Sequence, residues 1–279
     1  MPSADRASNR FAVPAALLIG GVALAYRERR TRRAVELVAA ASLETLLNAI
    51  EANDEETGMH VRRVAAYALV IAQAAGLDER RQRAVERIAL FHDIGKIHEA
   101  LFDIVHEGAR LTPAERRAVA THPRRGADVL APLASFYPDL PRGVLSHHER
   151  WDGTGYPRGL RGTRIPLEAR IVTIADTLDA VSHHRRYRRG SGINAALRVI
   201  EEGRGQQFDP SFVDLVLLPP VIERLVKVHG RAVAAETRRQ VKHTAPAPAQ
   251  RRERVPDVTF RWRSESLGSR RVHAAQNAD

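Results

Sequence analysis

Apolar residues along most of the chain recur at three- and four-residue steps, which is the spacing of one face of an α-helix. No run of residues alternates in the way that a half-buried strand requires. Pro113, Pro166 and Pro210 stand where a first helical turn tolerates proline. The segments with this helical pattern are Arg32 to Ala52, Val61 to Ala75, Glu79 to Phe91, Pro113 to Thr121, Arg124 to Leu133, Arg142 to His148, Pro166 to Val181, Ile193 to Glu201 and Pro210 to Val228. The pattern predicts an all-α fold.

The run from Phe11 to Tyr26 is uncharged and mostly aliphatic, and slightly shorter than the roughly 20 residues that span a bilayer as a helix. Five arginines follow it before residue 34, so the positive-inside rule places the rest of the chain in the cytoplasm. We expect a single inner-membrane anchor with the globular domain in the cytoplasm. The alternatives are a signal peptide cleaved near Ala23-Leu24-Ala25 and a buried or surface helix, in which case the protein is cytoplasmic.

Two other stretches interrupt the helical pattern. Trp151 to Ile165 contains four glycines and Pro157, which is typical of a structured loop. Beyond about Gly230 the periodicity fades into a basic segment, which predicts disorder. The expected organisation is an N-terminal segment at 1–10, a transmembrane helix at 11–26, a connecting helix at 27–52, a globular domain at 40–230 and a disordered tail at 231–279.

The amino-acid composition limits which metal ligands and which binding partners are expected. The apolar content of 44% is ample for a buried core, and the chain has no cysteine, so a metal ion must take imidazole and carboxylate ligands. Such ligands suit iron, manganese or zinc. The net charge of +11 is unevenly spread. A cluster at Arg185 to Arg189 suits an anionic substrate, whereas the basic tail suits a solvated segment, so nucleic-acid binding is not expected.

Histidines and acidic residues gather in five short motifs and suggest a metal centre. Taken singly, each motif is also explained by a structural hydrogen bond. Burying His92 and Asp93 at the end of an apolar helix costs several kcal/mol unless they are paired or bind a cation. Asp176 lies in an equally apolar segment. The eight candidate ligands, enough for two or three ions, are Glu56, His60, His92, Asp93, His122, His147, His148 and Asp176.

The order of further motifs between about residues 40 and 218 makes a specific resemblance. They are His92-Asp93 with Lys96, His122-Pro123, His147-His148-Glu149, Trp151-Asp152-Gly153, Gly155-Tyr156-Pro157, Ile174-Ala175-Asp176, Asp179-Ala180 and Phe208-Asp209-Pro210. The chain resembles an HD-GYP domain, the branch of the HD phosphohydrolase superfamily that hydrolyses cyclic di-GMP. The resemblance implies an HD-domain-like helical bundle around two or three divalent ions, and hydrolysis to pGpG with further cleavage to GMP.

The resemblance also implies roles for single residues. Asp93 bridges two ions, Glu56 favours a third, and the metal is iron or manganese. Lys96 binds the scissile phosphate and, with Asp93, is catalytic, while Arg185 and Arg188 hold the dinucleotide. One segment departs from the family pattern. Many members read Ser-Asp-Arg-Pro-Tyr-Arg where this chain has His183-His184-Arg185-Arg186-Tyr187-Arg188, which keeps both arginines but changes the loop.

The ligand set predicts a mechanism and leaves two alternatives. Ions held about 3.5 to 4 Å apart can share a hydroxide formed near neutral pH, which would attack phosphorus in line. One alternative is a non-catalytic receptor that binds cyclic di-GMP and contacts protein partners through the Gly155-Tyr156-Pro157 loop. The other is an HD phosphohydrolase acting on a different nucleotide, such as a hybrid cyclic dinucleotide.

Overall fold

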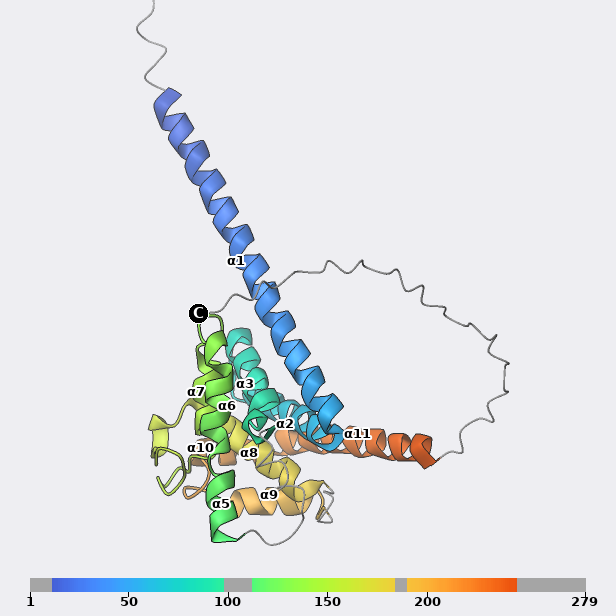
Figure 1. Ribbon diagram of the computed structural model, residues 1–279. Coiled ribbons are helices and arrows are strands. Elements are labelled where there is room, and N and C mark those ends of the chain that lie inside the picture. Colours follow the sequence, from blue (N-terminus) through green and yellow to red (C-terminus); the bar gives the residue numbers. More distant parts are fainter. Residues whose placement is uncertain (1–11, 98–111, 184–189, 245–279) are drawn as a thin grey trace, which may run out of the picture. The chain divides into compact units, whose positions relative to one another are not determined.

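The computed structural model describes residues 12–97, 112–183 and 190–244, which fold into helices joined by short loops (Figure 1). The all-α prediction is confirmed. The chain divides into two units after Arg238, and every element of the site belongs to the first unit. The elements are α1 (Ala12–Asn53), α2 (Glu55–Ala74), α3 (Glu79–Phe91), η1 (Ile94–Ile97), α5 (Pro113–Val119), α6 (His122–Leu130), η2 (Ala131–Leu133), α7 (Asp139–Ser146), η3 (Gly162–Arg164), α8 (Leu167–Ser182), α9 (Ile193–Glu202), α10 (Pro210–Val216) and α11 (Pro219–Thr244).

Helices α2, α3 and α8 pack against one another and form the centre of the domain (Figure 1). Helix α7 packs on α3, α6 packs on α7 and η1, and α9 packs on α8. The apolar stripes of the three central helices bury side chains such as Ile71, Ile88 and Ile174 completely. Each such side chain contributes about 1.5–3 kcal/mol through removal from water. The polar residues of the site project from this rigid core.

Capping residues explain where several helices begin. The side chain of Asp54 accepts the Glu56 N–H and starts α2, and Asp78 accepts the Arg81 N–H and starts α3. Thr112 and Glu115 form a reciprocal capping box at α5. These side chains satisfy amide groups that the first helical turn leaves without partners. Helix α2 therefore starts immediately before Glu56, and His60 follows one turn later.

The C-terminal part of the chain differs from the prediction in two places. The single helix expected from Pro210 to Val228 is two helices, because Pro219 begins a new helix after Leu217 and Leu218. Helix α11 then continues to Thr244, so the disordered tail does not begin at residue 231. Its last turns are rich in alanine and arginine, which favour helix. Residues 245–279 of the expected tail lie outside the described residues.

The predicted membrane helix and connecting helix belong to one element, α1. Its C-terminal half packs on α2 and buries Leu43, Leu47 and Ile50, whereas Leu37 is 71% exposed. Among the residues that the structure describes, no helix combines the length and apolar character that crossing a bilayer requires. The anchor expected at 11–26 stays a prediction, and residue 11 lies outside the described residues.

Candidate metal centre

Four buried histidines, each in a helix or directly after one, lie close together. His60 lies in the second turn of α2, and His122 is the first residue of α6. His92 and His147 are the C-cap residues that directly follow α3 and α7. Three of them make the same kind of hydrogen bond, in which Nδ1 donates to the backbone carbonyl oxygen three residues earlier. These contacts are His92 to Ala89 at 2.8 Å, His122 to Val119 at 2.7 Å and His147 to Val144 at 2.6 Å.

These hydrogen bonds place the proton of each neutral imidazole on Nδ1 and leave a lone pair on Nε2. The Nε2 atoms of His122 and His147 face each other at 3.1 Å. Two acceptors at that distance repel unless a cation or a proton lies between them. The Nε2 atom of His92 is buried and has no hydrogen-bond partner among the described residues. The donor set therefore fits a metal ion, which is the usual partner of such nitrogens.

Asp93 lies between two groups of histidines, as expected of a bridging carboxylate. Its Oδ1 is 3.3 Å from His122 Nε2 and 3.9 Å from His147 Nε2. Its Oδ2 is 3.7 Å from His60 Nε2 and 3.5 Å from His92 Nε2. Each carboxylate oxygen of Asp93 therefore lies near one of the two groups of histidines. One group holds Asp93, His122, His147 and His148, the other His60, His92 and Asp93, and within each group the donor atoms lie within 4.8 Å of one another.

Burial sets the protonation of these ligands. It lowers the pKa of His92, holds that of His147 well below its usual range, and lowers that of His148 to about 3, with neighbouring imidazoles acting in the same direction. Burial alone raises the pKa of Asp93, but Lys96, His92 and His122 outweigh it and hold that pKa well below its usual range. Neutral imidazoles and an ionised carboxylate are the forms that bind metals.

Asp176 and Lys96 complete the surroundings of Asp93. Asp176 Oδ1, on α8, is 3.5 Å from His60 Nε2 and 3.8 Å from His92 Nε2, so it belongs with the second histidine group. Lys96, on η1, donates from Nζ to Asp93 Oδ2 at 2.6 Å. Its side chain is partly exposed, which leaves the ammonium accessible to an anion from solvent. Asp176 and Lys96 thus both border the histidine groups, and their roles stay predictions.

The glycine-rich loop borders the site. The ring of Tyr156 stacks on His148, with centroids 4.9 Å apart and planes 26° apart. Glu149 is buried, and its carboxylate accepts the N–H groups of Arg158 at 2.8 Å and Leu160 at 2.9 Å. Glu149 therefore holds the loop in place, while Tyr156 shapes the edge of the site and covers one ring of it.

Glu56 is a described candidate ligand that is not brought into the histidine groups, and two candidate substrate residues lie outside the described residues. Glu56 lies one turn before His60 on α2, is partly buried, and belongs to neither group. Its role toward a third ion stays a prediction. Arg185 and Arg188, expected to hold the substrate, lie outside the described residues. His183 precedes them and is buried.

Asp179 is a site residue to which the sequence pattern assigned no role. Its Oδ2 accepts from His60 Nδ1 at 2.7 Å, and its Oδ1 accepts from Arg63 Nε at 2.6 Å. Burial by itself raises its pKa, but contacts with His183, His60 and Arg63 hold the pKa well below its usual range. Arg63 also binds Glu236 of α11 at 2.6 Å. The spacing of the sequence could have identified Asp179, because it follows Asp176 by three residues and lies on the same face of α8.

The profile of one protein family, described as HD domain, matches residues 44–212. This stretch contains every candidate metal ligand and covers more than half of the chain.

Three curated proteins illustrate the similarity. The cyclic di-GMP phosphodiesterase response regulator RpfG of Xanthomonas campestris is 39% identical over 178 residues, covering 63% of this chain and 47% of that protein. The 3′3′-cGAMP-specific phosphodiesterase 3 of Vibrio cholerae is 39% identical over 163 residues, covering 58% and 35%. A cyclic di-GMP phosphodiesterase of Thermotoga maritima is 36% identical over 178 residues, covering 63% and 48%. The chain spans less than half the length of each of these relatives.

Proposed function

The chain belongs to the HD domain family, in the HD-GYP branch that its motifs predicted, and on that premise we propose that it is a metal-dependent phosphodiesterase that hydrolyses cyclic di-GMP to pGpG. The observation that carries the proposal is the convergence of buried Nε2 lone pairs on the two oxygens of Asp93. An arrangement of this kind is costly in an empty protein interior and is stabilised by divalent cations.

The candidate ligands divide into two sets, one for each of two ions. His122, His147 and His148 would hold one ion, and His60, His92 and Asp176 a second, with Asp93 shared between them. Because all the donors are imidazole or carboxylate, iron or manganese suits the site. Bound divalent cations polarise phosphate oxygens and lower the pKa of a coordinated water.

Other residues would act on the substrate directly. The ammonium of Lys96 is directed at the same carboxylate as the ligands and can neutralise charge on the scissile phosphate. Tyr156 walls the site at His148 and can exclude water from one side of a bound dinucleotide. We assign Arg185 and Arg188 to the remaining phosphate or guanine.

The decisive experiment is turnover by the purified chain. Protein loaded anaerobically with iron or manganese is incubated with cyclic di-GMP, and the products are separated by chromatography. We expect pGpG from the wild type and none from Asp93→Asn, which retains the shape of the side chain but not its charge. Binding of cyclic di-GMP by the wild type without any turnover would instead establish a receptor.

A hybrid cyclic dinucleotide is the second candidate substrate. The identity to the 3′3′-cGAMP-specific enzyme, 39%, equals the identity to RpfG. Relative rates for cyclic di-GMP and 3′3′-cGAMP under identical metal loading separate the two. A higher kcat/KM for 3′3′-cGAMP would reassign the substrate without changing the reaction class.

Glu56 determines whether the proposed site takes a third ion. The carboxylate lies one turn from His60 on the same face of α2, within the reach of a neighbouring ligand. Metal analysis of Glu56→Ala is expected to find one equivalent fewer than in the wild type, with cleavage stopping at pGpG instead of continuing to GMP. Equal metal content in both proteins would leave a two-ion site.

A further inference from the structure

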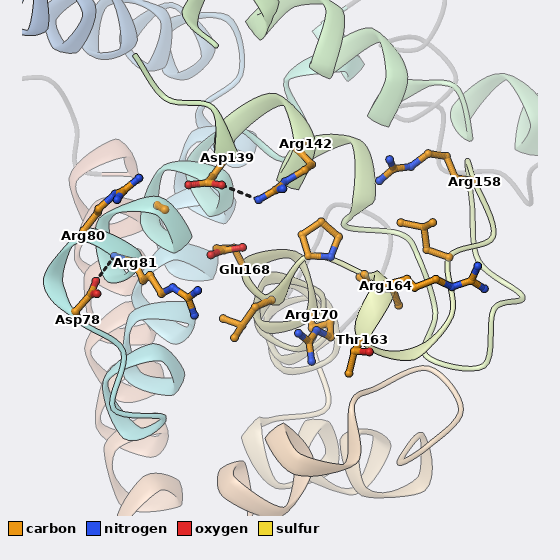
Figure 2. Close-up of a pocket in the computed structure, with 15 residues that line it drawn as sticks. Asp78, Arg80, Arg81, Asp139, Arg142, Arg158, Thr163, Arg164, Glu168 and Arg170 are labelled. Carbon is orange, nitrogen blue, oxygen red and sulfur yellow. Dashed lines mark hydrogen bonds and ion pairs between the residues drawn. The ribbon is translucent and has the colours of Figure 1, made fainter. Parts of the chain in front are cut away.

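A cavity of about 540 Å³ opens outside the histidine groups, and none of its lining residues is a candidate metal ligand (Figure 2). Its volume falls within the range of small-molecule sites, roughly 300–1,000 Å³. Six arginines line it, against three acidic residues. The arginines are Arg80, Arg81, Arg142, Arg158, Arg164 and Arg170.

Three helices begin at this cavity. The lining includes first-turn residues of α3, α7 and α8. Helix N-termini carry a partial positive charge and amide hydrogens that lack partners within the helix. Helix α8 has sixteen residues, and no side chain caps its N-terminus. The backbone therefore adds to the positive potential of the arginines.

Not all of these arginines are neutralised by neighbours. Arg142 pairs with Asp139 at 2.7 Å, and Arg170 pairs with Asp209 at 2.5 Å. The guanidinium groups of Arg80, Arg81 and Arg164 have no ion-pair partner within the part of the chain that the structure describes. All three are exposed at the rim, on two separate segments. Planar guanidinium groups around a concave surface are suited to the bidentate binding of phosphate.

Glu168 gives the cavity a second kind of recognition. Its residue is only 7% exposed, and its carboxylate forms no hydrogen bond or ion pair among the described residues. Figure 2 shows it directed into the cavity from the first turn of α8. A carboxylate that faces a cavity without a protein partner accepts strongly from N–H donors. The ligand that fits therefore carries adjacent N–H groups as well as a phosphate.

We propose that this cavity binds a guanine nucleoside monophosphate. Its phosphate would contact Arg80 and Arg81 on one side of the cavity, and its ring N–H and amino group would donate to Glu168. Guanine presents this pair of donors and adenine does not. The site lies outside the metal centre, and its occupancy does not depend on the proposed phosphodiesterase reaction.

Calorimetric titration of the full chain with GMP tests the location of the site. Arg81→Gln removes one exposed guanidinium from the cavity and is expected to weaken GMP binding about tenfold. Arg83→Gln is the matched control, because it removes one exposed arginine from the same helix but outside the cavity. Affinity that survives Arg81→Gln but is lost in Asp93→Asn would assign GMP to the metal centre and overturn the proposal.

A ligand panel tests the role of Glu168. The wild type is expected to bind GMP more tightly than AMP, guanosine or inorganic phosphate. Glu168→Gln is expected to abolish the preference for GMP over AMP while retaining binding that depends on Arg81. Equal affinities for GMP and AMP in the wild type would refute base recognition by Glu168. Because each readout is binding, a failure of the phosphodiesterase assay leaves these results unaffected.

Discussion

At the scale of single residues, the orientation of the histidine rings decides what the site can bind. The Nδ1 atoms of His92, His122 and His147 hydrogen bond to backbone carbonyl oxygens, whereas that of His60 hydrogen bonds to the carboxylate of Asp179. A carboxylate makes the opposite ring nitrogen a stronger ligand. His60 is therefore the ligand whose metal affinity depends most on another side chain.

Asp179→Asn should lower the metal affinity of the second ion about 10- to 100-fold, because the amide neither orients His60 in the same way nor adds to its basicity. Metal titration with a fluorescent chelator as competitor measures the change. Asp128→Asn, an exposed carboxylate on α6, is the control and should bind metal like the wild type. An unchanged affinity in Asp179→Asn would remove Asp179 from the positioning of His60.

The same carboxylate makes stability depend on pH. Because the pKa of Asp179 is depressed in the folded protein, its contribution is fully present above the unfolded value of about 3.9 and is lost as pH falls toward the folded value. The stability difference between the wild type and Asp179→Asn should therefore shrink from about pH 4 downward. Urea unfolding of chelator-treated protein measures it. A difference that stays constant down to about pH 2 would contradict this assignment.

At the scale of elements, the ligands are placed by close contacts between short segments. Element η1 packs on α6, and a methyl group on Gly95 would lie 2.1 Å from the carbonyl oxygen of His122. The absence of a side chain at Gly95 thus lets Asp93 approach His122. Helix α8 contributes in a similar way, since the Thr173 hydroxyl donates to the carbonyl oxygen of His147 at 2.6 Å.

Gly95→Ala should separate η1 from α6, destabilise the protein by about 2 kcal/mol or more, and reduce the amount of metal bound. Thermal unfolding and metal analysis together report both effects. Gly230→Ala on α11 is the matched control. A methyl group there meets nothing within 4 Å, so this helix interior should gain up to about 1 kcal/mol. Full metal content in a stable Gly95→Ala protein would show that the contact is dispensable.

At the scale of the whole molecule, the metal centre joins helices that are distant in sequence. Its candidate ligands come from α2, α6 and α8 and from the residues that directly follow α3 and α7. In the metal-free protein these buried lone pairs repel one another, so metal binding and folding are thermodynamically coupled. Arg63 extends the coupling from Asp179 to Glu236 on α11.

Removing the metal should therefore lower the melting temperature of the entire domain. An ion present at about a hundred times its Kd stabilises the folded state by about 2.7 kcal/mol, equivalent to about 5 °C or more for a domain of this size. Differential scanning calorimetry with and without chelator measures the shift. His147→Ala should reduce it, and a chelator-insensitive melting temperature in the metal-loaded wild type would argue against an occupied site.

The sequence by itself determined the helical class, most helix positions and the residues that are candidate metal ligands. Apolar periodicity is a local property of the sequence, and histidine and aspartate motifs can be recognised in a sequence without knowledge of the fold. The local sequence pattern predicted helix boundaries less well where helix-favouring and helix-breaking residues are neighbours. At Pro219 two prolines divided a continuous apolar stripe, and beyond residue 231 good helix formers extended α11 through a segment that had looked merely basic.

Only the tertiary structure decided which atoms meet. It directed the Nε2 atoms of His122 and His147 toward each other, gave Asp93 one oxygen for each group, and placed Asp179 behind His60. It also assembled the arginine-lined cavity from the first turns of three helices and a loop. These results depend on packing between segments far apart in the chain, where separations of a few tenths of an ångström decide a contact. Sequence spacing constrains such distances only within one helix or turn.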